Sequence, residues 1–172
     1  TGSTAVGKHI NGIVGKRLGS SIMELGGNNA LIISKEADLD MSIPAIVFGA
    51  VGTAGQRCTS TRMVIVHHEV YEEVKDRLVK AYSQVAGRIG NPLDEHTLVG
   101  PLVDKGAVKL FTDALEKVKK EGGNILFGGD QVQGHGYESG TYVVPALAEV
   151  ENHYQIVQDE TFAPLLYLIK YK

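Results

Sequence analysis

The residue best suited to covalent chemistry is Cys58, the only cysteine in this chain of 172 residues. A thiolate nucleophile must be reachable, and small neighbours help because they let a substrate approach the backbone closely. Small residues stand on both sides of it, at Gly52-Thr53-Ala54-Gly55 and at Thr59-Ser60. We therefore treat Cys58 as a candidate nucleophile. The alternative is a small buried apolar residue, since free cysteines are among the most buried residues.

Glu24 is a candidate general base, because a carboxylate that reaches a reacting group can take its proton. It precedes the flexible corner Gly26-Gly27-Asn28-Asn29 and lies 34 residues before Cys58. The alternative is an ordinary exposed acid at the end of a strand.

Two further features are suited to binding charged groups. Gly2 and Ser3 open a predicted helix, whose free backbone N–H groups and dipole favour a pyrophosphate. Arg57 stands next to Cys58 and always carries its charge, so it is able to pair with a substrate carboxylate through two hydrogen bonds. The alternative for Arg57 is a structural side chain that holds backbone carbonyls of its loop.

The six histidines match no spacing typical of a metal site, so we expect no metal and surface or edge positions for all of them. They are His9, His67, His68, His96, His135 and His153. One alternative function is a Cys–His hydrolase that uses His67 or His68 as its base. Such an enzyme would need neither a cofactor nor Glu24.

The elements that position these residues follow from the spacing of apolar residues. Helical spacing predicts helices over residues 4–18, 38–54, 69–86 and 104–121. Short apolar runs predict extended segments over residues 22–25, 30–34, 63–66, 124–127, 142–144 and 165–171, with a tight turn between the first two. This alternation predicts an α/β domain with a largely parallel open sheet flanked by helices. The glycine-rich residues 128–140 are expected to form a mobile surface loop.

Composition excludes several classes of partner. The chain is 43% hydrophobic, and its net charge of −3 offers no basic surface for nucleic acid or anionic lipid. No run approaches the roughly 18 apolar residues that a membrane span needs. A single cysteine predicts a reducing compartment, the cytoplasm or, in a eukaryote, the mitochondrion. Because the chain starts without methionine, we expect a fragment of a longer protein.

Four motifs resemble those of the aldehyde dehydrogenase superfamily, in the family's order. Glu24-Leu25-Gly26-Gly27 and Gly55-Gln56-Arg57-Cys58-Thr59 are similar to its paired active-site signature, and their separation fits. Thr1-Gly2-Ser3-Thr4-Ala5-Val6-Gly7 resembles its cofactor-contacting turn, without the phenylalanine that usually precedes it. Glu160-Thr161-Phe162-Ala163-Pro164 resembles its nicotinamide-side motif.

The resemblance implies oxidation of an aldehyde with NAD as cofactor, or NADP as the alternative. Cys58 would add to the aldehyde carbonyl to give a thiohemiacetal and, after hydride transfer, a thioester. Glu24 would activate the water that hydrolyses the thioester, and Arg57 would contact the substrate. Cofactor contacts are implied for Gly2, Ser3, Leu25, Glu160 and Phe162.

Three variants within the motifs resemble the antiquitin group of this family. They are Asn28-Asn29-Ala30, Val51-Gly52-Thr53-Ala54 and Thr161-Phe162-Ala163-Pro164. Most other groups carry a lysine near position 28 and a Phe-Gly-Pro ending. The antiquitin group oxidises α-aminoadipic semialdehyde, or handles its cyclic form piperideine-6-carboxylate. The resemblance therefore implies an amino-acid semialdehyde and a place in lysine catabolism.

By the same resemblance, residues 1–26 are the tail end of an NAD-binding domain and residues 27–172 belong to the catalytic domain. Most of the NAD domain, the family's oxyanion-binding asparagine and its C-terminal oligomerisation segment would lie outside the chain. The full-length protein would be a homodimer or homotetramer. We expect the isolated chain to be essentially inactive, and a folded noncatalytic fragment is the remaining alternative.

Overall fold

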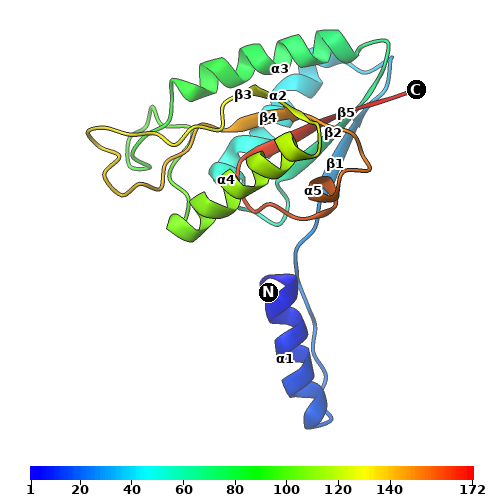
Figure 1. Ribbon diagram of the computed structural model, residues 1–172, viewed down its shortest axis with the longest axis vertical. Coiled ribbons are helices and arrows are strands. Elements are labelled where there is room, and N and C mark those ends of the chain that lie inside the picture. The colour runs from blue at the N-terminus through cyan, green and yellow to red at the C-terminus, as the bar shows by residue number, and fades with distance from the viewer.

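The computed structural model describes residues 1–172 and contains one five-stranded sheet (Figure 1). The strands lie in the order β1 (Asn29–Ile33), β2 (Thr61–His67), β5 (Leu165–Tyr171), β4 (Ala146–Glu149) and β3 (Asn124–Phe127). Only the β3–β4 pair is antiparallel. The expected α/β domain with a largely parallel sheet is confirmed.

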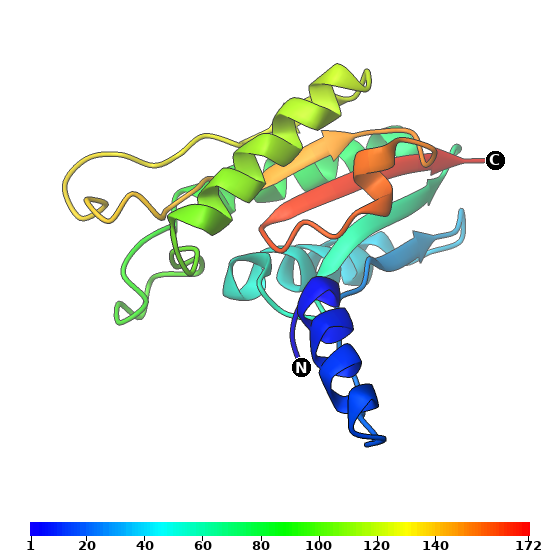
Figure 2. The ribbon, with the colours of Figure 1, turned by 60° about the horizontal axis from the view of Figure 1, so that its bottom comes forward.

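Helices cover both faces of the sheet. Figure 2 shows α2 (Leu39–Val51) and α3 (Tyr71–Ala86) behind the strands, and α4 (Lys105–Lys120) and α5 (Gln155–Gln158) in front of them. The middle strand β5 is consequently buried along residues 165–169, as expected for a parallel strand covered on both sides. Helices α2 and α4 start where Asp38 and Asp104 accept hydrogen bonds from the first free backbone N–H groups. None of the helices combines the length and the apolar character needed to cross a membrane.

Helix α1 (Thr4–Lys16) projects away from the sheet (Figure 1). It starts at Ser3, whose hydroxyl accepts a hydrogen bond from the Val6 N–H. Residues 17–28 form an arm that runs back beside α1 toward β1. Leu25 of the arm packs closely on Gly7 of α1. The contact is so close that a Cβ added at Gly7 would lie 2.5 Å from a Leu25 methyl carbon.

Two of the predicted extended segments are wrong. Residues 22–25 lie in the arm and have no neighbouring strand with which to share backbone hydrogen bonds, so the expected turn between two strands is absent. Residues 142–144 form only an isolated bridge from Val143 to Gln131. Pro145 has no N–H for a ladder, and the strand begins after it at Ala146.

The loop over 128–140 is tied down through the Tyr137 hydroxyl, which donates to the Ile89 carbonyl.

Candidate active site

Three segments that are distant in sequence meet at one edge of the sheet. Residues 26–28 lead into β1, residues 55–60 (the Cys58 loop) lead into β2, and residues 159–164 (the 159–164 loop) lead into β5. These three strands are parallel neighbours, so their amino ends lie side by side. The site therefore lies at the amino ends of the strands, whereas open α/β sheets usually bind ligands at the carboxyl ends.

The Cys58 loop follows an unusual stretch of backbone, the short 3-10 helix η1 (Gly52–Gly55). The predicted helix to residue 54 ends early because Thr53, Ala54 and Gly55 have φ angles of 54°, 52° and 67°. The left-handed region is costly for Thr53 and Ala54, and such strain is concentrated at functional sites. A Cβ at Gly55 would lie 2.5 Å from the Ala163 carbonyl oxygen, so glycine is required for the contact between the two loops.

Cys58 is exposed and lines a cavity of about 570 Å³. The same cavity is lined by five residues for which the sequence predicts cofactor contacts, namely Gly2, Ser3, Leu25, Glu160 and Phe162. Phe162 is 42% exposed, so its ring is available to a ligand. The volume lies in the range of small-molecule and cofactor sites. The tertiary structure thus brings the thiol and the predicted cofactor contacts into one space.

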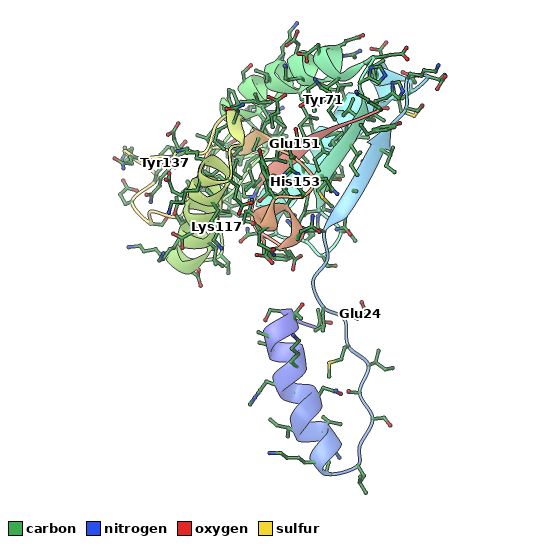
Figure 3. The ribbon with its side chains drawn as sticks, turned by 45° about the vertical axis from the view of Figure 1, so that its right-hand side comes forward. Glu24, Tyr71, Lys117, Tyr137, Glu151 and His153 are labelled. Carbon is green, nitrogen blue, oxygen red and sulfur yellow. The ribbon has the colours of Figure 1, made fainter.

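The predicted base Glu24 and the predicted substrate contact Arg57 do not line this cavity. Glu24 lies on the arm beside α1 (Figure 3), with an exposed side chain. Its carbonyl oxygen accepts a hydrogen bond of 3.0 Å from the Gly2 N–H. Arg57 extends over the ring of Phe48 on α2, with 5.7 Å from the guanidinium carbon to the ring centroid.

Arg62 is a site residue that sequence reasoning missed. Its side chain is 2% exposed, and burial lowers the pKa of its guanidinium, while the neighbouring Glu160 carboxylate opposes that shift. One guanidinium nitrogen donates to the carbonyls of Gly55 and Thr161, and the other donates to the Arg57 carbonyl and to Glu160. The role of holding loop carbonyls, considered for Arg57, belongs to Arg62. The signal in the sequence was the alternation of Arg62 with Val64 and Val66, which places all three side chains on the inward face of the strand.

The two asparagines of the flexible corner also join these segments. The Asn29 side-chain amide donates to the carbonyl oxygens of Cys58 and Ser60, at 2.6 and 2.9 Å. The Asn28 amide donates to the Val157 carbonyl of α5, at 3.0 Å. The Cys58 loop is therefore attached to the start of β1 independently of Arg62.

One wall of the cavity comes from α4, for which the sequence predicted a helix but no part in the site. Leu110, Asp113, Ala114 and Lys117 share one face of that helix because they are spaced by three and four residues. Leu110 is 62% exposed because it faces the cavity. Figure 3 shows Lys117 on the same helix.

The histidines lie on the surface or at the edge of the structure, as the sequence predicts, and none lines the cavity. Possible ligand atoms of His67, His68 and Glu69 lie within 4.8 Å of one another. However, Nδ1 of His67 already accepts a hydrogen bond from the Glu69 backbone N–H. Cys58 lies before the first residue of β2 and His67 is the last residue of that strand. The length of a seven-residue strand, about 20 Å, therefore separates them. This separation removes the geometric basis for a Cys–His hydrolase.

The chain is similar to known proteins in both sequence and structure. The profile described as "Aldehyde dehydrogenase family" matches residues 1–172. Alpha-aminoadipic semialdehyde dehydrogenase from Rattus norvegicus is 49% identical over 173 aligned residues, which cover 100% of this chain and 31% of the relative. The corresponding protein from Bos taurus is 47% identical with the same coverage. The chain thus spans about a third of the length of the curated relatives it matches.

Solved structures agree on the fold. HpcC from Thermus thermophilus superposes with a TM-score of 0.94 at 31% identity, over 99% of this chain and 34% of that one. Betaine aldehyde dehydrogenase from Staphylococcus aureus, solved in complex with NAD⁺, gives a TM-score of 0.95 at 24% identity, with 99% and 34% coverage. At that identity the second likeness concerns the fold alone.

Proposed function

Since this chain belongs to the aldehyde dehydrogenase family, we propose that it supplies the thiol-bearing part of the active site of an NAD(P)-dependent dehydrogenase. Its substrate is an amino-acid semialdehyde such as α-aminoadipic semialdehyde, which the enzyme oxidises to the carboxylate. The observation that carries the proposal is the cavity in which Cys58 stands with Gly2, Ser3, Glu160 and Phe162. The relatives named for this semialdehyde support the choice of substrate.

The residues around the cavity fit a nicotinamide cofactor. Ser3 caps α1 by accepting from the Val6 N–H, and the N–H groups of Thr4 and Ala5 in the same first turn stay available to a pyrophosphate. The Glu160 carboxylate is suited to accept hydrogen bonds from ribose hydroxyls, and the exposed Phe162 ring to pack beside the nicotinamide. Leu25 provides apolar surface on the opposite segment. When bound, the cofactor supplies the hydride acceptor.

Cys58 is the nucleophile in this proposal. Its thiolate sulfur forms a bond to the aldehyde carbon, and the carbonyl electron pair moves to oxygen to give a thiohemiacetal alkoxide. The backbone N–H of Cys58 is one donor suited to stabilise that charge. Loss of hydride from the same carbon leaves a thioester on Cys58. The exposure of the thiol supports this role over that of a buried apolar residue.

Glu24 is the base for the second half of the reaction. It takes a proton from water, the hydroxide oxygen adds to the thioester carbon, and collapse of that adduct releases the Cys58 thiolate and the carboxylic acid, which loses its proton to solvent to give the carboxylate product. Glu24 is adjacent to Leu25, which lines the cavity, while its own carboxylate is exposed to water.

Arg57 recognises the carboxylate of the substrate in this scheme. It is adjacent to Cys58 in sequence but its side chain lies outside the cofactor-sized cavity. This arrangement suits an aldehyde that reaches the thiol from a different side than the cofactor. A guanidinium is well matched to a carboxylate because its planar N–H groups allow two parallel hydrogen bonds.

We assign residues 1–26 to an NAD-binding domain and residues 27–172 to the catalytic domain. The projection of α1 away from the sheet, with Val6, Ile10 and Ile13 exposed, supports a division near residue 26. The second oxyanion donor and the oligomerisation segment belong, in this proposal, to the rest of a homodimeric or homotetrameric protein.

The test is Cys58→Ala in the full-length protein. We expect loss of both aldehyde dehydrogenase activity, measured as NADH formation, and esterase activity, measured with a nitrophenyl ester. Ser60→Ala in the same loop is the control for damage to the backbone. Ordinary turnover by Cys58→Ala would refute the nucleophile assignment.

A further inference from the structure

Arg62 occupies a position normally taken by an apolar residue. It faces the core on the same side of β2 as Val64 and Val66, and all three are buried. The pairing of β1 with β2 changes register at this point, from Asn29 opposite Thr61 to Ala30 opposite Met63, so that Arg62 has no partner on β1. Such a bulge redirects a side chain, and bulges are frequent next to active sites.

Stability alone does not explain a buried guanidinium here. Taking a charge out of water is costly, and replacement of a buried ion pair by apolar residues is often neutral or stabilising. Arg62 also leaves its buried Nε without a hydrogen-bond partner. Its four acceptors instead come from two loops, Gly55 and Arg57 in the Cys58 loop and Glu160 and Thr161 in the 159–164 loop.

The carboxylate of Glu160 is held between Arg62 and the backbone of Gly26. One oxygen lies 3.2 Å from a guanidinium nitrogen of Arg62. The other oxygen lies so close to the Gly26 backbone that it would be only 1.9 Å from a Cβ added at that residue. No other ion pair is formed by Glu160. The Cys58 loop, in contrast, has the additional tether from Asn29.

We propose that Arg62 is a positioning residue that anchors the Glu160 carboxylate to the backbone of the Cys58 loop, and so sets the place of the cofactor ribose relative to the thiol. This inference rests on the proposed function of Glu160. Arg62 itself is buried beneath the two loops and acts through Glu160. The ring of Phe162 covers it, with 5.1 Å from the guanidinium carbon to the ring centroid.

The experiment measures NAD affinity of the full-length protein by titration calorimetry, for Arg62→Met and Arg62→Lys. Methionine keeps most of the side-chain volume without the charge, and lysine keeps the charge but does not reach four acceptors in fixed directions. We expect the dissociation constant to rise about tenfold in Arg62→Met, a typical loss for a hydrogen bond to a charged group. Arg77→Met, an arginine on α3 paired with Asp40, is the control and should bind as wild type does.

A double-mutant cycle with Glu160→Gln separates positioning from general damage. If Arg62 acts through Glu160, the double variant binds NAD no more than about twofold weaker than Glu160→Gln alone. The cofactor-independent esterase activity of Cys58 should also be retained better than the dehydrogenase activity, because Asn29 still holds the Cys58 loop. Circular dichroism identifies a variant that does not fold. If Arg62→Met unfolds, Arg62→Lys supplies the cycle.

Three outcomes would overturn the inference. The first is that the losses of NAD affinity in the Arg62 variant and in Glu160→Gln multiply in the double variant. The others are unchanged NAD affinity in folded Arg62 variants and an equal loss of the esterase and dehydrogenase activities. A wild-type protein that binds neither NAD nor NADP would instead overturn the proposed function. The two failures are therefore distinguishable by titration of the wild type.

Discussion

At the scale of single residues, the thiol and the predicted acid occupy different surroundings. Cys58 follows left-handed backbone at Thr53, Ala54 and Gly55 and faces the cavity. Glu24 stands on the arm, exposed and outside the cavity. In the proposed function the thiol acts in the first step and the acid acts on water in a later step.

Replacement of Glu24 by Gln should slow thioester hydrolysis more than hydride transfer, because glutamine keeps the shape but accepts no proton. We expect steady-state turnover to fall about 100-fold, a usual contribution of a general base. A single-turnover burst of NADH, followed by stopped-flow absorbance, should survive. Glu36→Gln, at an exposed acid paired with Lys35, is the control. Collapse of the burst itself would require another role for Glu24.

Arg57 yields a prediction about substrate choice. In Arg57→Ala, KM for semialdehydes that carry a carboxylate should rise about tenfold, because a charge-assisted hydrogen bond is lost. KM for propanal, which has no carboxylate, should stay near the wild-type value. An equal loss with both aldehydes would show that Arg57 supports the loop through its packing on Phe48 instead.

At the scale of elements, the corner before β1 combines two adjacent glycines with different surroundings. A Cβ at Gly26 would collide with Glu160, whereas a Cβ at Gly27 would meet nothing closer than Asn29, at 3.9 Å. Neither glycine has a positive φ, so the difference between them is steric. The corner thus determines where the 159–164 loop is able to place its carboxylate.

Gly26→Ala should therefore displace Glu160 and weaken NAD binding about tenfold, the loss expected for one hydrogen bond to a charged group. Gly27→Ala is the matched control and should bind NAD within about twofold of wild type. Both affinities are measured by calorimetric titration of the full-length protein. Equal affinities in the two variants would contradict the proposed place of Glu160.

At the scale of the whole molecule, the chain holds the thiol and part of the cofactor cavity on one compact sheet, with α1 standing apart. We expect the isolated chain to produce no NADH from an aldehyde, because the proposed function assigns the second oxyanion donor and the remainder of the cofactor site to the rest of the protein. A disulfide reagent should still label the exposed Cys58, which shows that the thiol is present. NADH production by the isolated chain, at the rate of the full-length protein, would contradict this expectation.

The sequence by itself determined the local elements and the family. Ser3 caps α1, and the apolar periodicity gives α3 and α4 with nearly the observed bounds, because caps and amphipathic faces depend on residues a few positions apart. The motifs around Glu24, Cys58 and Glu160 are read in the same local way. The family profile confirms the membership of the aldehyde dehydrogenase family that these motifs predict.

Only the tertiary structure decided which residues meet. The order of β1, β2 and β5 brings the three loops together, and the buried Arg62 directs its guanidinium toward two of them. Residues 22–25 lack a strand for the same reason, since a strand needs a neighbour that local sequence does not specify. Leu110 faces the cavity, which apolar periodicity does not show because it identifies the apolar face of a helix without the surface that the face contacts. Contacts over about 100 positions, such as Arg62 with Glu160, depend on packing free energy summed over the whole fold.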